Sequence, residues 1–416
     1  MTLRNIILLL LALCSAGISA RAQNPPAPVP LPTLDALGLP LDEWLAGGDR
    51  AEITWRVDIR PARLQLHQRL IFTVRVEVPC KSLAESEAGH RLLLIARLAG
   101  PDGRWHENAG VAAHELPEDL PGNAVVTFNL QAQVLPGDYT VGVVLYDRAT
   151  KLHSVARRPL RVRPLQNDPL PAAWKNLPTV EFLDPPGPPR RRVSRLWLPV
   201  ETSRPLAIDL LVNFSSSEQF AGRRWVDRMN VDVMTTLLFV LAQMNVPHGT
   251  LRATGVDLLR RHTIFEGRRM DDPGWSRIFE ELSAVDAGVI DASDLISRRE
   301  NPAFFREVFA DRAAQICSET RAAAAAENPS AVQPQRVLIV ISSGILFSHG
   351  ADLTPVRPVA GCDLRVIHLR YQINRSNLWD QLEKVLRPLH PRRFEARSPE
   401  TFRRALAALL AELSRL

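Results

Sequence analysis

Up to about residue 163, apolar and polar residues alternate with a period of two, which is typical of β-strands that bury one face. The segments that show this pattern are 53–59, 70–78, 91–98, 124–130, 137–146 and 154–162. Turn-forming residues separate several of them, as in Gly100–Gly103 and Leu135–Gly137. Short strands with turns at regular intervals predict an all-β sandwich over residues 51–163.

The stretch Pro136–Tyr139 leads directly into the strand predicted at 141–146. It resembles the corner at which a tyrosine hydroxyl ties back a loop in immunoglobulin-like domains. The resemblance implies an immunoglobulin-like sandwich. Sandwiches of this kind more often present or space another domain than perform chemistry.

Residues 201–416 alternate strands with helices. Buried strands are predicted at 206–212, 337–341 and 364–369, a short one at Phe394, and an antiparallel edge pair within 249–265. Helical spacing of apolar residues predicts helices at 226–244, 275–285 and 302–326. Ser398-Pro399-Glu400 is a helix start with serine at the N-cap, and it opens a last helix. This alternation predicts a three-layer, doubly wound α/β domain of the Rossmann-like class.

Two proline-rich segments lie outside these domains. Residues 23–50 are rich in proline, leucine and glycine and are interpreted as a leader that orders on contact or as a simple spacer. Residues 164–200 are interpreted as a linker, because Pro185–Pro189 is incompatible with a helix or a central strand. Within this linker, Leu196–Leu198 is expected to dock back on one of the domains.

Residues 1–22 have the pattern of a signal peptide. Arg4 precedes the short apolar run Ile6–Leu13, and Ala20-Arg21-Ala22 forms a cleavage site before Gln23. The apolar run is too short to span a bilayer, and no other stretch comes close, so we expect no stable membrane insertion. A periplasmic or extracellular location follows. The alternative, a lipoprotein modified at Cys14, requires a small residue where the bulky Leu13 stands.

Composition narrows the classes of partner. The net charge of +6 is carried mostly by arginine, without the interleaved aromatic residues of a nucleic-acid-binding face, so nucleic acid is not expected as a partner. Three cysteines lie beyond residue 22, namely Cys80, Cys317 and Cys362. Two readings stay open: Cys317 pairs with Cys362, or all three are buried thiols. Metal-ligand spacing such as C-x-x-C is absent from the sequence.

Polar residues follow two of the predicted strands at the point where each ends. Asn213, Ser215 and Ser217 follow the strand at 206–212, and Ser343 follows the strand at 337–341. The carboxyl ends of parallel strands meet at one edge of a sheet, where such residues form a polar pocket. A serine cluster at the start of a loop also has a simpler explanation, because its hydroxyls can satisfy exposed backbone donors.

The order strand–NxSxS–helix, then strand–SSG, then a strand and a capped terminal helix resembles a von Willebrand factor type A (VWA) domain over residues 200–416. With an exported chain and a preceding β-domain, it resembles the bacterial secreted VWA-related proteins. In that family, an aspartate of the first motif and another after the fourth strand hold a divalent cation that bridges to an acidic group of a partner protein. The first aspartate falls on Asn213 and the second on Ser343, while Ser215 and Ser217 keep the serines. Asp291 is the nearest candidate on the middle loop, which in the family carries a threonine.

Neutral side chains in place of both aspartates leave too little negative charge to offset desolvation of Mg²⁺ or Ca²⁺. The sequence therefore predicts a degenerate metal site without a cofactor, in a non-catalytic protein that binds another protein outside the cytoplasm. The expected contact surface is formed by Asn213, Ser215, Ser217, Asp291 and Ser343. The competing hypothesis is a metal-dependent adhesin in which Asp291, perhaps with Glu218, supplies the charge.

An extracytoplasmic hydrolase is the third hypothesis, with Ser343 as the nucleophile. His349, His368, Asp352 and Asp363 are the histidines and carboxylates closest to strand ends. However, the sequence has no G-x-S-x-G motif, P-loop, dinucleotide-binding fingerprint or H-E-x-x-H motif. We therefore expect no enzyme activity.

Overall fold

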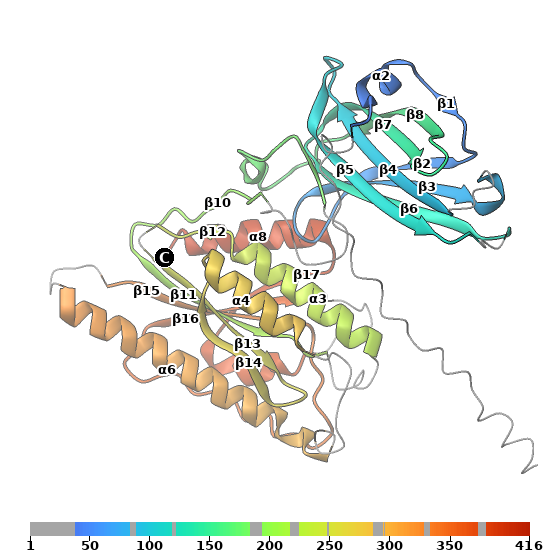
Figure 1. Cartoon of the computed structure of the whole chain (residues 1–416). Coiled ribbons are helices and arrows are strands. Elements are labelled where there is room, and N and C mark those ends of the chain that lie inside the picture. Colours follow the sequence, from blue (N-terminus) through green and yellow to red (C-terminus); the bar gives the residue numbers. More distant parts are fainter. Residues whose placement is uncertain are drawn as a thin grey trace, which may run out of the picture.

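The computed structural model describes residues 38–83, 89–118, 122–183, 194–216, 224–247, 249–285, 294, 296–327, 333–372 and 380–416. Its strands form four sheets and its helices lie mostly in the second half, in a multidomain arrangement (Figure 1). We refer to residues 38–183 as the N-terminal unit and to residues 194–416 as the C-terminal unit. The predicted signal peptide and Cys14 lie outside the described residues.

Two antiparallel sheets make up the N-terminal unit, with strand orders β1-β8-β7-β4-β5 and β2-β3-β6-β9. They share one core, to which Phe72, Phe128 and Val143 contribute fully buried side chains. The strands are β1 (Arg50–Ala51), β2 (Arg56–Leu64), β3 (Leu70–Pro79), β4 (His90–Ala99), β5 (Trp105–Leu116), β6 (Val125–Val134), β7 (Gly137–Asp147), β8 (His153–Val162) and β9 (Val180–Phe182). All six predicted strands are present, and β1, β5 and β9 are additional.

Both predicted proline-rich segments contribute to this unit. Helix α2 (Leu41–Ala46) buries Leu41 and Leu45 against the outer face of the five-stranded sheet, and Trp44 stacks on His153 at 4.1 Å between ring centroids. At the other end, β9 pairs with β6 and extends the four-stranded sheet. Segments without a strand-like alternation thus complete the sandwich, because their apolar residues still find a buried face.

Tyr139 ties back the turn before β7, as the sequence predicted. Its hydroxyl donates a hydrogen bond of 2.9 Å to the carbonyl oxygen of Leu135. The ring is buried, so the bond replaces water that neither group reaches easily.

Replacing Tyr139 with phenylalanine is expected to lower the free energy of unfolding by about 1–3 kcal/mol, because the carbonyl of Leu135 loses its donor. Denaturant unfolding followed by tryptophan fluorescence measures the change. Tyr146→Phe is the matched control, since no hydrogen bond of that hydroxyl is found among the described residues. Equal losses in the two variants would contradict the role of the Tyr139 hydroxyl.

The main sheet of the C-terminal unit has the strand order β14-β13-β11-β15-β16-β17. Its strands are β11 (Leu206–Asn213), β13 (Thr250–Asp257), β14 (His262–Arg269), β15 (Gln335–Ser342), β16 (Leu364–Tyr371) and β17 (Arg392–Ala396). All pairs are parallel except β13 with β14, which confirms the predicted antiparallel edge. Numbered along the chain, the order is 3-2-1-4-5-6, so it reverses between β11 and β15.

Helices cover both faces of this sheet (Figure 1). On one face, α3, α4 and α8 pack over side chains such as Ile208 and Ile339, and on the other, α6 and α7 pack over Leu211 and Val340. The helices are α3 (Arg224–Leu241), α4 (Asp272–Ser283), α6 (Asn301–Glu327), α7 (Leu382–Leu386) and α8 (Pro399–Leu413). Short 3₁₀ helices lie at Cys80–Ser82, Pro171–Trp174, Arg298–Glu300 and Arg387–Leu389. The predicted start of α8 is confirmed, with Ser398 in a capping box with Thr401.

Residues 194–200 enter the core of the C-terminal unit. Leu196 and Leu198 are buried there, whereas Trp197 is 41% exposed. A two-stranded parallel sheet of β10 (Leu198–Pro199) and β12 (Met244–Asn245) fixes the segment. The expected docking of Leu196–Leu198 is therefore observed.

The two units meet where the turn between β2 and β3 contacts α8. Gln68, fully buried, donates from Nε2 to the carbonyl oxygen of Pro399 at 3.2 Å and accepts at its own carbonyl a bond of 2.8 Å from Trp174 Nε1. Arg403 of α8 forms a two-pronged ion pair with Asp168 at 2.6 and 2.8 Å, and its guanidinium lies 4.6 Å from the centre of the Trp174 ring. This contact unites both units and the chain between them.

The cysteines follow the first of the two readings. Cys317 of α6 forms a disulfide with Cys362, just before β16, while Cys80 is a buried free thiol. The bridge joins the helix that covers one face of the sheet to the start of a buried strand.

In the described part of the chain, no helix combines the length and apolar character needed to cross a bilayer.

Candidate functional site

Asn213, Ser215, Ser342 and Ser343 define what we call the switch-point site. β11 and β15 are adjacent, and their register pairs Val212 with Ile341, so both strands end side by side. Ligands of open α/β sheets bind outside the carboxyl ends of the strands at the point where the strand order reverses. The position of this site in the fold is therefore that of a ligand-binding site.

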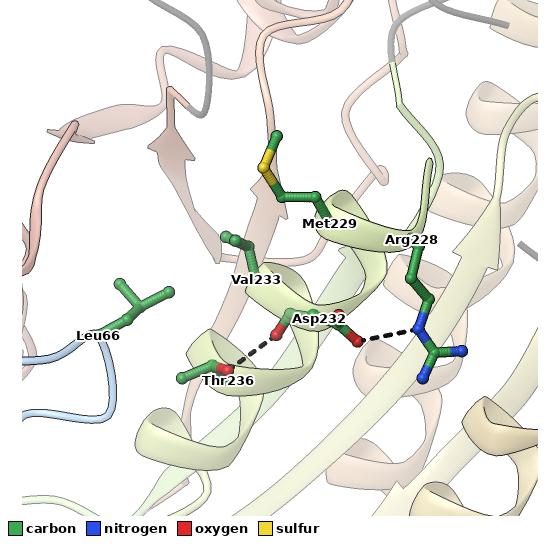
Figure 2. A pocket seen from close by; sticks show the side chains of 6 residues that line it. All are labelled: Leu66, Arg228, Met229, Asp232, Val233 and Thr236. Atoms are coloured by element: carbon green, nitrogen blue, oxygen red, sulfur yellow. Dashed lines mark hydrogen bonds and ion pairs between the residues drawn. The ribbon is translucent and has the colours of Figure 1, made fainter. Parts of the chain in front are cut away.

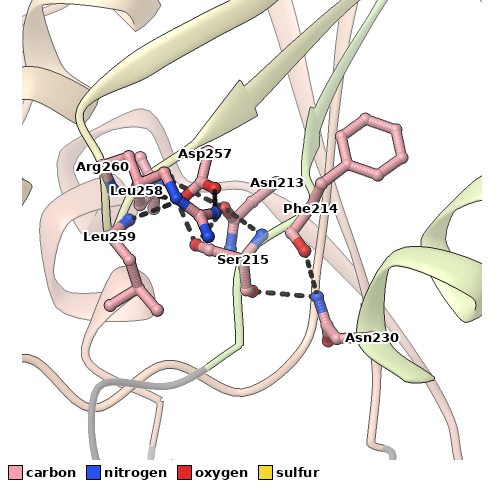
Figure 3. A network of polar contacts seen from close by, with 8 residues as sticks. All are labelled: Asn213, Phe214, Ser215, Asn230, Asp257, Leu258, Leu259 and Arg260. Carbon is pink, nitrogen blue, oxygen red and sulfur yellow. Dashed lines mark hydrogen bonds and ion pairs between the residues drawn. The ribbon is translucent and has the colours of Figure 1, made fainter. Parts of the chain in front are cut away.

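The side chain of Asn213 is fully engaged by its own surroundings (Figure 3). Its Oδ1 accepts from the Ser215 hydroxyl at 2.8 Å, from the Ser215 N–H at 3.2 Å and from the Leu258 N–H at 3.4 Å. Its Nδ2 donates to the carbonyl oxygen of Ser215 at 3.1 Å. That last bond requires an amide, because an aspartate in the same place has no hydrogen to donate.

Two neighbours complete the same network. Asn230 of α3 donates from Nδ2 to the carbonyl oxygens of Phe214 and Ser215, at 2.7 and 2.9 Å. The Ser215 hydroxyl accepts from the Leu258 N–H at 3.1 Å while it donates to Asn213. The oxygens of Asn213 and Ser215 thus hold loops together, which agrees with the simpler explanation considered for the serine cluster.

The nearest carboxylate in Figure 3, Asp257 at the end of β13, is also engaged. Its Oδ1 accepts from the N–H groups of Leu259 and Arg260 at 3.0 and 3.1 Å, and its Oδ2 forms an ion pair with the Arg260 guanidinium. Arg260 therefore neutralises the one negative charge that the neighbouring strand contributes.

The oxygen atoms at the switch-point site do not fit a divalent cation. Mg²⁺ and Ca²⁺ require several oxygens and compensating negative charge. Here, Asn213 and Ser215 are neutral and hydrogen-bonded to protein donors, and Asp257 is paired with arginine. Among the described residues, no cluster of three or more histidine, cysteine or acidic side chains is placed to hold a metal ion.

The structure brings together three of the five predicted site residues. Asn213 and Ser215 lie at the end of β11, next to Ser343 just after β15, and all three are buried. Ser217 and Asp291 lie outside the described residues, as does Glu218. The Ser343 hydroxyl is buried and has no hydrogen-bond partner within the described ranges.

Sequence reasoning did not assign His368 and Asp380 to this site. His368 Nε2 lies 3.1 Å from the Ser342 hydroxyl and 3.9 Å from Asp380 Oδ2. Burial, with smaller contributions from Arg370 and Arg393, lowers the pKa of His368 to about 4, and burial raises the pKa of Asp380 to about 6. The only available signal was that His368 lies in a buried strand.

This arrangement differs from that of a serine hydrolase. A catalytic triad uses both ring nitrogens of the histidine, one toward the serine and one toward the carboxylate. Here, Ser342 and Asp380 both face Nε2, and Nδ1 has no hydrogen-bond partner among the described residues. The hydrolase hypothesis placed the nucleophile at Ser343, but it is Ser342 that contacts the histidine.

A hollow of about 420 Å³ lies where the units meet (Figure 2). Leu66 faces one side of α3 across it, and the apolar side chains of Met229 and Val233 contribute to its wall. The polar groups bond within the helix: Arg228 pairs with Asp232 at 3.3 Å, and Thr236 donates to the carbonyl oxygen of Asp232 at 2.8 Å. Polar groups that converge on a ligand are therefore lacking among the described residues of this hollow.

Comparisons with known proteins leave the family open. No family model matches the chain, and no curated protein matches it. Solved structures that resemble parts of it include the TFIIH p34 N-terminal domain, with 13% identity, a TM-score of 0.30 and coverage of 49% of this chain and 97% of that one. Proximal thread matrix protein 1 from the mussel byssus, with a zinc-occupied MIDAS motif, has 13% identity, a TM-score of 0.25 and coverage of 51% and 48%.

A β-glucuronidase of Bacteroides uniformis matches with 12% identity and a TM-score of 0.20, and the match covers 82% of this chain and 39% of that one. All three TM-scores lie below the level at which a likeness supports an argument. Neither a metal-binding nor an enzymatic function is transferred from these proteins.

Proposed function

We propose that the chain is an exported, non-catalytic protein-interaction protein. Its C-terminal unit is a VWA-like domain that has lost its metal site, and its N-terminal unit is an immunoglobulin-like sandwich that supports it. The proposed contact surface is the switch-point site, extended by Ser217 and Asp291. The observation that carries the proposal is the neutral, internally bonded pair of Asn213 and Ser215 at the point where the strand order reverses.

The topology supports this assignment of fold. The order 3-2-1-4-5-6 with helices on both faces is that of a doubly wound α/β domain. The bond from Tyr139 to Leu135 supports an immunoglobulin-like sandwich, because a tyrosine corner recurs in that class.

The disulfide supports export. Disulfides between protein cysteines persist in oxidising compartments and are rare in the reducing cytosol. The pairing of Cys317 with Cys362 therefore agrees with the signal peptide predicted over residues 1–22.

We expect the melting temperature of the protein to change by less than about 1 °C in excess Mg²⁺ or Ca²⁺, because a ligand raises it only by binding the folded state. The informative variant is Asn213→Asp/Ser343→Asp, which restores both family carboxylates. Binding at a concentration 100 times Kd stabilises by about 2.7 kcal/mol, so this variant should gain several degrees in Mg²⁺. Differential scanning fluorimetry with and without EDTA measures both.

A rise in the unmodified protein would contradict the loss of the metal. If Asp291→Ala abolished that rise, the metal-dependent adhesin would be the correct reading. Asn213→Asp alone serves as the control for any destabilisation caused by losing the Nδ2 bond to Ser215.

Partner binding can be tested with a pair of matched variants. Ser343→Arg places a bulky cation at the switch-point site, whereas Ser414→Arg places it at the end of α8, at the opposite edge of the sheet. We compare the proteins that co-purify with each variant from the native envelope. The proposal requires that Ser343→Arg lose a protein that Ser414→Arg retains, at unchanged melting temperature.

A further inference from the structure

Buried polar side chains form a connected group next to the switch-point site. Ser342 ends β15, and β16 runs beside it with His368 opposite Val340 and Arg370 opposite Ser342. Asp380 lies just before α7. The side chains of His368 and Asp380 are 1% and 0% exposed, so neither reaches water directly.

Asp380 links this group to the chain that leaves β15. Its Oδ1 accepts from the N–H of Ile345 at 3.3 Å and from the N–H of Leu382 at 3.1 Å. Its Oδ2 faces Arg370 Nη1 at 3.7 Å and His368 Nε2 at 3.9 Å. One carboxylate oxygen therefore holds the backbone after Ser343, and the other faces the histidine.

A neutral imidazole has one nitrogen that accepts a hydrogen bond, through a single lone pair. In the structure, the Ser342 hydroxyl is placed to donate to that lone pair on His368 Nε2, at 3.1 Å. A proton added to the pair lies either on Nε2 or on Asp380 Oδ2, which then donates to Nε2 after a small approach. In both cases, Nε2 ceases to accept from Ser342.

We propose that Asp380 and His368 form a proton-linked switch that sets the conformation of the switch-point site. Uptake of one proton removes the acceptor of the Ser342 hydroxyl and weakens the hold of Asp380 on Ile345. The backbone from Ser342 to Phe347, which includes Ser343, then rearranges. A site outside the cytoplasm would thereby respond to the acidity of its surroundings.

The surrounding charges agree with uptake of a single proton at mildly acidic pH. The charged groups that face the pair are Arg370 of β16, Glu383 of α7, and Arg393 and Glu395 of β17. Burial raises the pKa of Asp380 to about 6 against the opposing effects of its N–H donors and Arg370. The pKa of His368 is about 4, so Asp380 takes up the first proton and His368 the second.

Overall stability does not report this switch, because two effects oppose each other. The raised pKa of Asp380 gives a contribution to stability that is present below about pH 4 and lost as pH rises through about 6. The lowered pKa of His368 gives the opposite contribution, which is lost as pH falls from about 6.5 toward about 4. Between about pH 4 and pH 6, the folded and unfolded pair each hold about one proton, so a local measurement is required.

Hydrogen–deuterium exchange of peptides that cover Ser342–Phe347 provides that measurement. After correction for the intrinsic rate, exchange should be about tenfold faster at about pH 5 than at about pH 7.5, because local opening becomes easier. Ser342→Ala removes the hydroxyl that must find a new acceptor, and it should remove most of this pH dependence. Equal protection at both pH values, or an unchanged effect in Ser342→Ala, would refute the switch.

A second measurement uses Asp380→Asn, in which His368 has no carboxylate to share a proton with. The melting temperature of this variant should fall further than that of the unmodified protein between about pH 7 and about pH 5, because only the unfolded histidine then takes up a proton. Parallel decreases would refute the shared proton. The proposed function concerns the same site, but neither measurement needs a partner, so each hypothesis can fail without the other.

Discussion

Replacing Arg403 with leucine is expected to lower the free energy of unfolding by about 3–5 kcal/mol, because it leaves a largely buried carboxylate without its cation. Arg403 is 1% exposed, and its two-pronged bond to Asp168 joins α8 to the chain between the units. Burial tends to raise the pKa of Asp168, but bonds from Arg403 and from the Leu170 N–H outweigh it, so that pKa lies below its usual range. The carboxylate is thus charged at neutral pH and depends on the arginine.

Urea unfolding measures the loss, and Arg404→Leu is the control on the exposed neighbouring position. The double variant Arg403→Leu/Asp168→Leu separates pairing from packing, since removal of both charges should recover part of the loss. A double variant as unstable as the sum of the two single variants would show that the ion pair itself contributes nothing.

Removing the disulfide with Cys317→Ala/Cys362→Ala is expected to cost about 4 kcal/mol, the loop-closure value for two cysteines 45 residues apart. The bridge limits the freedom of the unfolded chain, so the loss should appear in the unfolding equilibrium. Reduction of the unmodified protein with dithiothreitol should produce the same loss, and the double variant should show no further change.

Cys80→Ala is the control for this experiment, because Cys80 is a buried thiol outside the bridge. Thiol titration of the unfolded protein without residues 1–22 offers an independent check. One free thiol agrees with the bridge, whereas three free thiols would mean that the cysteines act as buried apolar residues.

The main sheet could be predicted because its inner strands carry continuous apolar runs. β11 and β15 are buried on both faces, so their sequences leave little choice of structure. β5 was not predicted, because its central residues are alanine and glycine, which have weak strand preference. Its place depends on a distant contact: Gly110 faces the ring of Phe182, and an added Cβ would lie 2.4 Å from that ring.

The location of the candidate site could also be predicted, since parallel strands end at one edge. Its chemistry could not be predicted in full. Asn230, Leu258 and Asp380 reach the site from other elements, and their contacts depend on strand register and helix position. The same limit applies to Asp209, which lies in a predicted buried strand 4.0 Å from Arg312 of α6.

The segment between the units gives up its apolar residues in two directions. β9 completes a sheet of the N-terminal unit, and Leu196 and Leu198 lie in the core of the C-terminal unit. A protease or a recombinant truncation that divided the chain anywhere in this region would strip one half of its lining. The molecule is thus better regarded as a single cooperative body with two lobes than as two beads on a string.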